Sequence, residues 1–237
     1  MYKIETRVRY SECGKDGKMK LASLINYFQD TSSEQSEMLG LGVSYLREKR
    51  RAWILSSWQI VINRMPNVHE EIVVSTWSTG IKKMLGPRNF RLTTKEGEVL
   101  AYADTLWVYM DVDKHRPTKP DQEETDAYGA EPALDMPCKE RKITVPEHTE
   151  LTCMMPVRKY HIDTNGHVNN AQYIQMAMEV ADWESSISQV RVEYKKSAVY
   201  GDTIMIKKAE EANRTIIELC DEEEQLFAIV ELTGERP

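Results

Sequence analysis

Three side chains that can do chemistry stand at every second position in one short stretch of the chain. Residues 158–170 have the sequence RKYHIDTNGHVNN, and within it lie Asp163, Asn165 and His167. A carboxylate can act as a general base or as a nucleophile, and an imidazole can donate a proton or hold a water molecule. An amide offers both donors and an acceptor. Together these groups suit attack on a carbonyl carbon, which also needs donors for the developing oxyanion.

The apolar pattern that follows predicts a helix to position these groups. Residues 168–185 place Ala171, Ile174, Ala177 and Met178 on one helical face. The first N–H groups of a helix have no internal acceptor and carry partial positive charge, so those of residues 168–170 are candidate oxyanion donors.

A structural role for this stretch is the alternative interpretation. Asp and Asn residues before a helix are common capping and turn residues, and we assign Asn169 and Asn170 mainly to capping and to hydrogen bonds within the loop. A histidine is also often a satisfied hydrogen-bonding residue. Three polar groups that converge around a glycine directly before an apolar helix favour catalysis for Asp163 and His167, and less so for Asn165.

The order of predicted elements is a strand, a helix and several strands, and it occurs twice. Alternating or β-rich runs predict strands, and helical spacing of apolar residues predicts helices. The first half has a strand at 2–10, a helix at 20–40 ending at Gly40, and strands at 52–63, 70–79, 87–95 and 98–110; the second half has a strand at 151–160, the helix at 168–185, and strands at 188–196, 202–209, 213–221 and 225–233.

A weak internal repeat supports this double order. Shifting the chain by 149 positions aligns five identical pairs in about twenty positions, which favours a duplicated domain. The pairs are Val8 with Val157, Arg9 with Arg158, Gly17 with Gly166, Ala22 with Ala171 and Ile25 with Ile174. We therefore predict an α+β fold in which each copy is an antiparallel sheet wrapped around a central helix, a tandem (double) hot-dog fold.

A polar, proline-containing segment separates the two halves. We predict an N-terminal hot-dog domain at 1–112, a linker at 113–150 and a C-terminal hot-dog domain with the active site at 151–237. The first-copy stretch that corresponds to the reactive one, SECGKDGKMK, lacks the Asn and His. We therefore expect one active site per chain.

Composition narrows the class of protein. A net charge of −7 argues against nucleic-acid binding, and no window approaches the length of a membrane span. The beginning of the chain resembles a strand rather than a targeting peptide.

The four cysteines are scattered without a CxxC pair, so we expect neither a zinc site nor a disulfide framework. A cytoplasmic location fits this cysteine usage. Neither a metal nor an organic cofactor is implied.

The motif DTNGHVNNAQYIQMAMEV resembles the D-x-N-x-H-V-N-N-x-x-Y-I-x-W-x-x-E signature of acyl-acyl-carrier-protein thioesterases. The stretches YFQDTSSEQSEMLGLG, AWILSSWQIVINRMPNVHEEIVVSTW and LWVYMDVDKHRPTKP are similar to other parts of that family, in the same order. The resemblance implies a tandem hot-dog fold and hydrolysis of fatty acyl-acyl carrier protein. It also implies catalytic roles for Asp163, Asn165 and His167.

The sequence departs from the plant members of the family at a second position. They have a Glu-Cys pair after Tyr-Arg-Arg, whereas VEYKKSAVYGD places Ser197 and Ala198 there. A thiol nucleophile is thereby lost, and Ser197 is left to orient a water or a neighbouring side chain. Plant members also carry a plastid-targeting extension that this sequence lacks, so it resembles a bacterial version.

Substrate and partner recognition would need an apolar slot and a basic patch. Acyl carrier protein is acidic, so docking on this acidic chain requires a local excess of positive charge. Candidate clusters are LREKRRAW at 46–53, IKKMLGPR at 81–88, KERK at 139–142 and RK at 158–159, and candidate slot residues are Leu24, Ile25, Phe28, Met38, Trp53 and Leu55.

Three other functions remain open at this point. They are an acyl-CoA thioesterase, a non-catalytic acyl-binding regulator on the same scaffold, and a dehydratase acting on hydroxyacyl chains. Acyl chain length and the pairing of two chains into a homodimer are also left open by the sequence.

Overall fold

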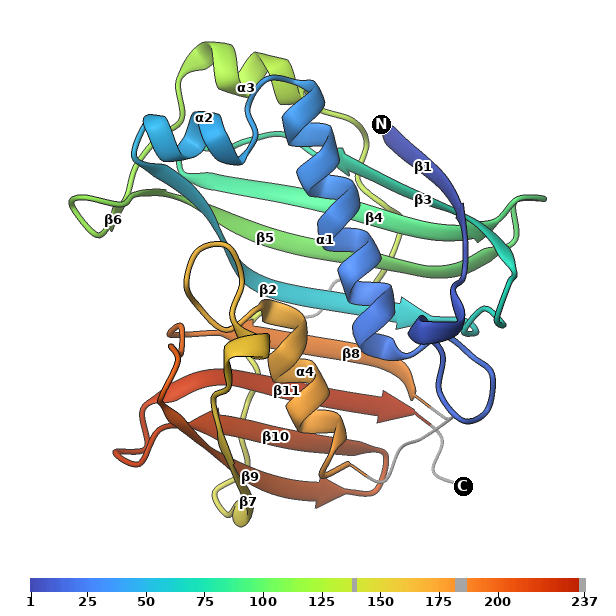
Figure 1. Ribbon diagram of the computed structural model, residues 1–237, viewed down its shortest axis with the longest axis vertical. Coiled ribbons are helices and arrows are strands. Elements are labelled where there is room, and N and C mark those ends of the chain that lie inside the picture. Colours follow the sequence, from blue (N-terminus) through green and yellow to red (C-terminus); the bar gives the residue numbers. More distant parts are fainter. Residues whose placement is uncertain (138–139, 182–186, 235–237) are drawn as a thin grey trace. The chain divides into compact units, whose positions relative to one another are not determined.

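The computed structural model describes residues 1–137, 140–181 and 187–234. The chain divides into two compact units. The first comprises residues 1–56 and 62–138, and the second comprises residues 57–61 and 139–237. Each unit contains an antiparallel sheet and a central helix, so the predicted α+β hot-dog architecture is confirmed in both copies (Figure 1).

In the first unit the strand order is β1-β3-β4-β5, with the short β6 beside β5. All of these neighbours are antiparallel. Alternating burial along β1, an edge strand, matches the alternating sequence that predicted it. The elements are β1 (Tyr2–Arg7), α1 (Leu21–Met38), α2 (Val43–Glu48), β2 (Arg51–Ile62), β3 (Glu71–Ser78), β4 (Leu85–Thr94), β5 (Val99–Asp111), β6 (Arg116–Pro117) and α3 (Gln122–Tyr128).

Helix α1 packs its apolar face on β1 and β3. Leu24, Ile25 and Phe28 are fully buried on that face, as their helical spacing predicts. The helix ends just before Gly40, whose φ of +73° is a backbone conformation that glycine adopts without strain. The predicted helix at 20–40 and its stop signal are therefore confirmed.

In the second unit the strand order is β8-β11-β10-β9-β7, again antiparallel throughout. Residues 57–61 of β2 are grouped with this unit, where they pair with β8. Helix α4 packs against β10 and β11. The elements are β7 (Glu150–Pro156), α4 (Asn170–Met178), β8 (Ile187–Tyr194), β9 (Thr203–Glu211), β10 (Arg214–Cys220) and β11 (Leu226–Gly234).

The second half differs from the sequence prediction at two element ends. Strand β7 stops at Pro156, and a 3-10 turn at Lys159–His161 takes up the end of the predicted strand 151–160. Helix α4 spans nine residues, fewer than the predicted 168–185. Residues 182–186 of that prediction lie outside the described residues.

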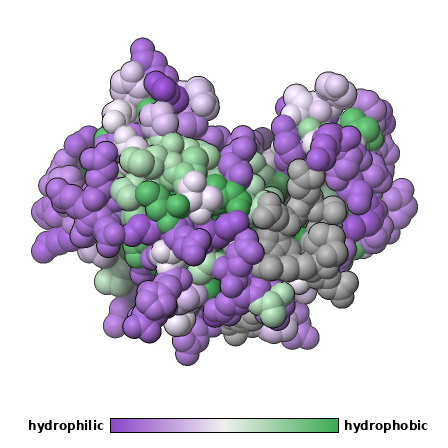
Figure 2. Space-filling view, turned by 90° about the horizontal axis from the view of Figure 1, so that it is seen from below, coloured by the Kyte–Doolittle hydropathy of each residue, from purple (hydrophilic) through white to green (hydrophobic). Residues whose placement is uncertain are grey.

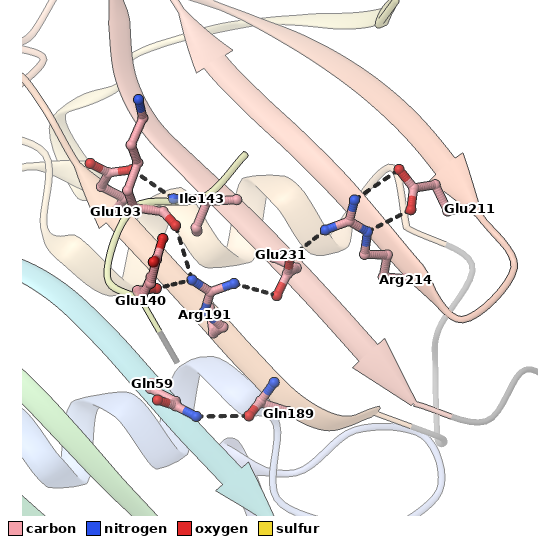
Figure 3. Close-up of polar contacts among 10 residues, drawn as sticks. Gln59, Glu140, Ile143, Gln189, Arg191, Glu193, Glu211, Arg214 and Glu231 are labelled. Atoms are coloured by element: carbon pink, nitrogen blue, oxygen red, sulfur yellow. Dashed lines mark hydrogen bonds and ion pairs between the residues drawn. The ribbon is translucent and has the colours of Figure 1, made fainter. Parts of the chain in front are cut away.

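The segment before β7 is held on the second sheet by hydrogen bonds from Arg191, which also forms a buried ion pair (Figure 3). Arg191 on β8 forms an ion pair with Glu231 on β11 at 2.8 Å and also donates to the backbone carbonyls of Glu140 and Lys142. Both side chains of the pair are at least nine-tenths buried. Ile143 then packs on the apolar sheet residues Ile216 and Ile229.

The predicted linker 113–150 contains regular structure in its first part. The helix α3 begins with a capping box between Asp121 and Glu124. The carboxylate of Glu124 is buried and accepts a hydrogen bond from the hydroxyl of Tyr109 at 2.6 Å. Residues up to 138 cluster with the first unit and the later ones with the second. The domain boundaries 1–112, 113–150 and 151–237 stay a prediction.

Much of the face drawn in Figure 2 is hydrophilic; its broadest group of apolar residues lies left of centre, and smaller apolar patches lie elsewhere. Within residues 1–137, 140–181 and 187–234, no helix is long and apolar enough to cross a membrane.

Candidate active site

A tight five-residue turn carries the three predicted reactive residues. Ile162 and Val168 form an isolated β-bridge at its base. The N–H of Asp163 donates to the carbonyl of His167 at 2.8 Å, and the N–H of Gly166 donates back to the carbonyl of Asp163 at 3.1 Å. Gly166 has a φ of +80°, which explains why glycine stands there. The turn carries Asp163, Asn165 and His167 on one short, internally hydrogen-bonded loop.

The carboxylate of Asp163 is held by one oxygen. Its Oδ1 accepts the backbone N–H of Asn165 at 2.8 Å and that of His167 at 3.4 Å. No residue in the described part of the chain donates to Oδ2. The carboxylate is therefore oriented by the turn while its second oxygen is left for a ligand or a water.

The side chains of Asn165 and His167 are exposed. Neither makes a side-chain hydrogen bond to another residue among the described ones. Both lie on the same turn as Asp163. The described residues also contain no cluster of His, Cys, Asp and Glu that could hold a metal ion.

The start of helix α4 is more fully capped than the sequence predicts. The side chain of Asn169 accepts the N–H of Ala171 at 2.9 Å, which confirms its predicted capping role. The N–H of Val168 donates to the carbonyl of Ala198, and the N–H of Asn169 donates to the carbonyl of His161, each at 2.9 Å. The expectation that these two N–H groups are open to an oxyanion is therefore wrong.

The fourth candidate, Ser197, lies on the segment that follows β8. Its side chain is exposed and makes no hydrogen bond within the described residues. The next residue, Ala198, is fully buried and its carbonyl accepts the N–H of Val168 at 2.9 Å. This bond brings Ser197 next to the turn that carries Asp163.

Two tyrosines that sequence reasoning missed contact this arrangement. The N–H of Ala198 donates to the hydroxyl oxygen of Tyr173 on α4 at 2.7 Å. The hydroxyl of Tyr194, at the end of β8, donates to the carbonyl of Asn170 at 3.0 Å. The two rings meet edge to face with centroids 5.9 Å apart. Burial, with the charges of Asp202 and Asp163, raises the pKa of Tyr173 to about 12, so this hydroxyl is neutral at physiological pH.

A buried histidine, His161, stabilises the backbone just before the 163–167 turn. The Nδ1 atom of His161 accepts the backbone N–H of Arg158 at 3.0 Å. Burial, and the nearby charge of Arg158, lower the pKa of His161, so the ring is held neutral as an acceptor. It caps the 3-10 turn that leads into the 163–167 turn, whereas the Asp-x-Asn-x-His spacing in the sequence selects His167.

The predicted acyl-slot residues divide by burial. Leu24, Ile25, Phe28 and Leu55 are buried in the first unit. Met38 is 72% exposed at the end of α1 and does not line an interior slot. A pocket of about 370 Å³ in this unit is instead polar and lies between β1 and α1, lined by residues that include Glu12, Tyr27 and Asp30.

The first unit contains the same turn without the reactive side chains. Cys13 and Met19 form the bridge, the N–H of Gly14 donates to the carbonyl of Lys18 at 2.9 Å, and Gly17 has a φ of +74°. Gly14, Asp16 and Lys18 occupy the places of Asp163, Asn165 and His167 under the 149-residue shift. The structure thus supports the internal repeat and shows which copy holds the chemistry-bearing groups.

Comparisons with known proteins agree with this architecture. The family model described as the acyl-ACP thioesterase N-terminal domain matches residues 1–128, and the model of the C-terminal domain matches residues 145–230. The chain is 28% identical over 179 residues to acyl-[acyl-carrier-protein] hydrolase FATB3, chloroplastic, of Cuphea viscosissima. The match covers 70% of this chain and 43% of that protein.

A second plant relative is palmitoyl-acyl carrier protein thioesterase, chloroplastic, of Gossypium hirsutum. It is 25% identical, and the match covers 80% of this chain and 50% of that protein. The chain therefore spans about half the length of the plant relatives that it matches.

Two solved structures share the fold over nearly the whole chain. An acyl-ACP thioesterase from Bacteroides thetaiotaomicron has a TM-score of 0.89 at 19% identity and covers 98% of this chain and 97% of its own. The 12:0-ACP thioesterase from Umbellularia californica has a TM-score of 0.86 at 18% identity, with 99% and 96% covered. At these identities the likeness supports the fold alone.

Proposed function

Because the chain belongs to the acyl-ACP thioesterase family, we propose that it hydrolyses the thioester of fatty acyl-acyl carrier protein and releases a free fatty acid. The observation that carries the proposal is the turn at 163–167, where Asp163 is fixed through Oδ1 and its Oδ2 is left for a reactant. The plant relatives are named for this activity.

In the proposed reaction Asp163 acts on the substrate through Oδ2. As a general base it takes a proton from a water molecule, and the water oxygen bonds to the carbonyl carbon of the thioester. The C–S bond then breaks, the acyl group leaves as a carboxylic acid, and the proton passes to the sulfur of the carrier's thiol. Direct attack by Asp163, followed by hydrolysis of the acyl-enzyme anhydride, uses the same oxygen.

The exposed side chains of Asn165 and His167 would serve the oxyanion and the water. Two of the three N–H groups expected to bind the oxyanion are already used within the protein. Side-chain donors on the turn therefore become the leading candidates. Single turnover in heavy-oxygen water tests for direct attack, because label enters the carboxylate of Asp163 only if an anhydride forms and water adds to its aspartyl carbonyl. Trapping the anhydride with hydroxylamine detects the path in which water adds to the fatty acyl carbonyl.

Residues 158–159 fit docking of an acidic carrier better than the 46–53 and 81–88 clusters do; Lys139 of the 139–142 cluster lies outside the described residues. Arg158 and Lys159 are exposed beside the turn and form no ion pair among the described residues. In the 46–53 cluster, by contrast, Lys49 and Arg50 are paired with aspartates at 2.6 and 2.7 Å. In the 81–88 cluster Arg88 is 92% buried, and the exposed Lys82 and Lys83 belong to the first unit, which lacks the turn of Asp163.

The decisive experiment compares carrier-bound and CoA-bound acyl substrates side by side, over a panel of chain lengths with products identified by mass. We expect higher kcat/KM for the carrier-bound series. A higher value for the CoA series would favour an acyl-CoA thioesterase, and no hydrolysis of either would favour an acyl-binding regulator.

A variant test addresses the docking surface. Reversing charge at Arg158→Glu and Lys159→Glu should raise KM for the carrier-bound substrate by about tenfold or more, with little change for a CoA thioester. The matched control is the exposed pair Lys82→Glu and Lys83→Glu. Equal effects of both pairs would remove residues 158–159 from the proposal.

A further inference from the structure

The segment after β8 is fixed on both sides at a single buried residue. Ala198 accepts the N–H of Val168 through its carbonyl at 2.9 Å and donates its own N–H to the hydroxyl oxygen of Tyr173 at 2.7 Å. The first bond ties the segment to the turn of Asp163, and the second ties it to helix α4. The peptide between Ser197 and Ala198 therefore has its orientation set by Tyr173.

The first unit builds the same segment without any tyrosine hydroxyl. There the N–H of Met19 donates to the carbonyl of Pro66 at 2.9 Å, as that of Val168 does to Ala198. Pro66 has no N–H that needs an acceptor, and Leu24 occupies the place of Tyr173 under the 149-residue shift.

The rest of the segment corresponds closely in the two units. The N–H of Asn67 donates to the carboxylate of Glu70 at 2.8 Å, and the N–H of Val199 donates to that of Asp202 at 2.9 Å. The backbone arrangement therefore forms in the first unit with proline and leucine. A proline and a leucine would therefore be enough at the places of Ala198 and Tyr173 if these positions served only the fold.

The second tyrosine also corresponds to a residue without a hydroxyl in the first unit. Tyr194 donates to the carbonyl of Asn170, in the first turn of α4, at 3.0 Å. The shift of 132 positions that sets Ala198 against Pro66 sets Tyr194 against Ile62, which has no hydroxyl. Both hydroxyls thus occur only in the unit that carries Asp163 and His167, and both act on the backbone around the reactive turn.

We propose that Tyr173, supported by Tyr194, is a positioning residue for the thioester hydrolysis: it fixes Ser197 and the 197–199 segment relative to the carboxylate of Asp163. The inference rests on the proposed function. The hydroxyl of Tyr173 acts through the backbone of Ala198 and need not touch the substrate. Losing it would leave a buried N–H without its acceptor and free the segment to shift. A shift of about 1 Å at a reacting group can cost about 10²-fold in rate.

The test is Tyr173→Phe, which removes the oxygen and keeps the ring. We expect kcat for acyl-carrier substrate to fall by about 10- to 100-fold, with KM within about twofold of the wild type. The matched control is Tyr27→Phe in the first unit, which removes a buried hydroxyl that donates to Glu12 at 2.8 Å. That variant should lose stability without losing kcat.

A double-mutant cycle separates positioning from general destabilisation. In an Asp163→Asn background, Tyr173→Phe should cause little additional loss of kcat, because the group being positioned is already disabled. The same fold-loss in both backgrounds, or full kcat in Tyr173→Phe, would overturn the inference. A wild-type protein without thioesterase activity would instead overturn the proposed function, so the two failures are distinguishable.

Discussion

The turns at 14–18 and 163–167 have nearly the same backbone, but only the second carries the predicted catalytic side chains. Each closes with a bridge, with a hydrogen bond of 2.8–2.9 Å across its ends, and with a glycine at positive φ. The first carries Gly14, Asp16 and Lys18, and the second carries Asp163, Asn165 and His167. The turn therefore forms with different side chains at these three places, and in each copy an aspartate accepts a backbone N–H of the turn. Their identity in the second copy therefore asks for an explanation in function.

The largest effect is expected at Asp163. Asp163→Asn keeps an oxygen that can accept the two N–H bonds of the turn but cannot take a proton, so kcat should fall by about 10³-fold with the fold intact. The control is Asp16→Asn, since Asp16 accepts the N–H of Lys18 at 3.0 Å in the first turn. Steady-state kinetics and thermal unfolding of both variants check this, and equal kinetic losses would erase the contrast between the turns.

The second effect concerns the imidazole. His167→Ala should lower kcat by about 10²-fold, because it removes a side-chain donor next to the reactant. Lys18→Ala, the matching change in the first turn, should leave kcat unchanged. Full activity of His167→Ala in the same assay would remove His167 from the site.

The third comparison uses the two glycines at positive φ. Gly166→Ala and Gly17→Ala should each cost about 1 kcal/mol of unfolding free energy, since alanine is strained in this conformation. Only Gly166→Ala should also lower kcat, because only that turn carries reactive groups. Chemical denaturation and kinetics on the two variants measure this, and a kcat loss for Gly17→Ala would contradict the assignment of one site per chain.

The smallest effect is a pH dependence carried by His161. Its pKa is lowered in the folded state from 6.5 by burial and by Arg158, so the unfolded chain binds more protons below that pH. Stability should therefore be unaffected by this group above about pH 6.5 and should fall as the pH drops below it.

His161→Asn supplies an uncharged acceptor for the same N–H. The loss of Tm between about pH 7.5 and about pH 5.5 should be smaller in this variant than in the wild type. Identical losses would mean that His161 does not contribute.

Sequence reasoning predicted the long elements because their apolar periodicity is strong. The strands of both halves and helix α1 were each found within a few residues. Helix α2 was missed because its six residues are too few for a period to show. Helix α3 lay in a polar segment assigned to a linker, although Asp121 and Glu124 spell a capping box that could have revealed it.

The site was predictable only where its residues are neighbours in the sequence. Asp163, Asn165 and His167 lie within five positions, so their spacing was visible. The contacts of Tyr173 and Tyr194 depend on tertiary hydrogen bonds between elements. The sequence holds two signals for them. Tyr173 stands at the Tyr of the quoted signature, and a second alignment of the halves, shifted by 132 positions, sets Ala198, whose N–H needs an acceptor, against Pro66, which has no N–H. The catalytic assignments of the four site residues stay predictions.

The Arg191 clamp has an evolutionary consequence. Its guanidinium recognises only main-chain oxygens of Glu140 and Lys142, whereas its own partner Glu231 is a specific buried side chain. Substitutions at 140 and 142 should therefore drift freely among homologues. Insertion or deletion of a single residue between Glu140 and Ile143 would move the two carbonyls away from Arg191. Homologues should therefore differ here by substitutions and keep the same segment length.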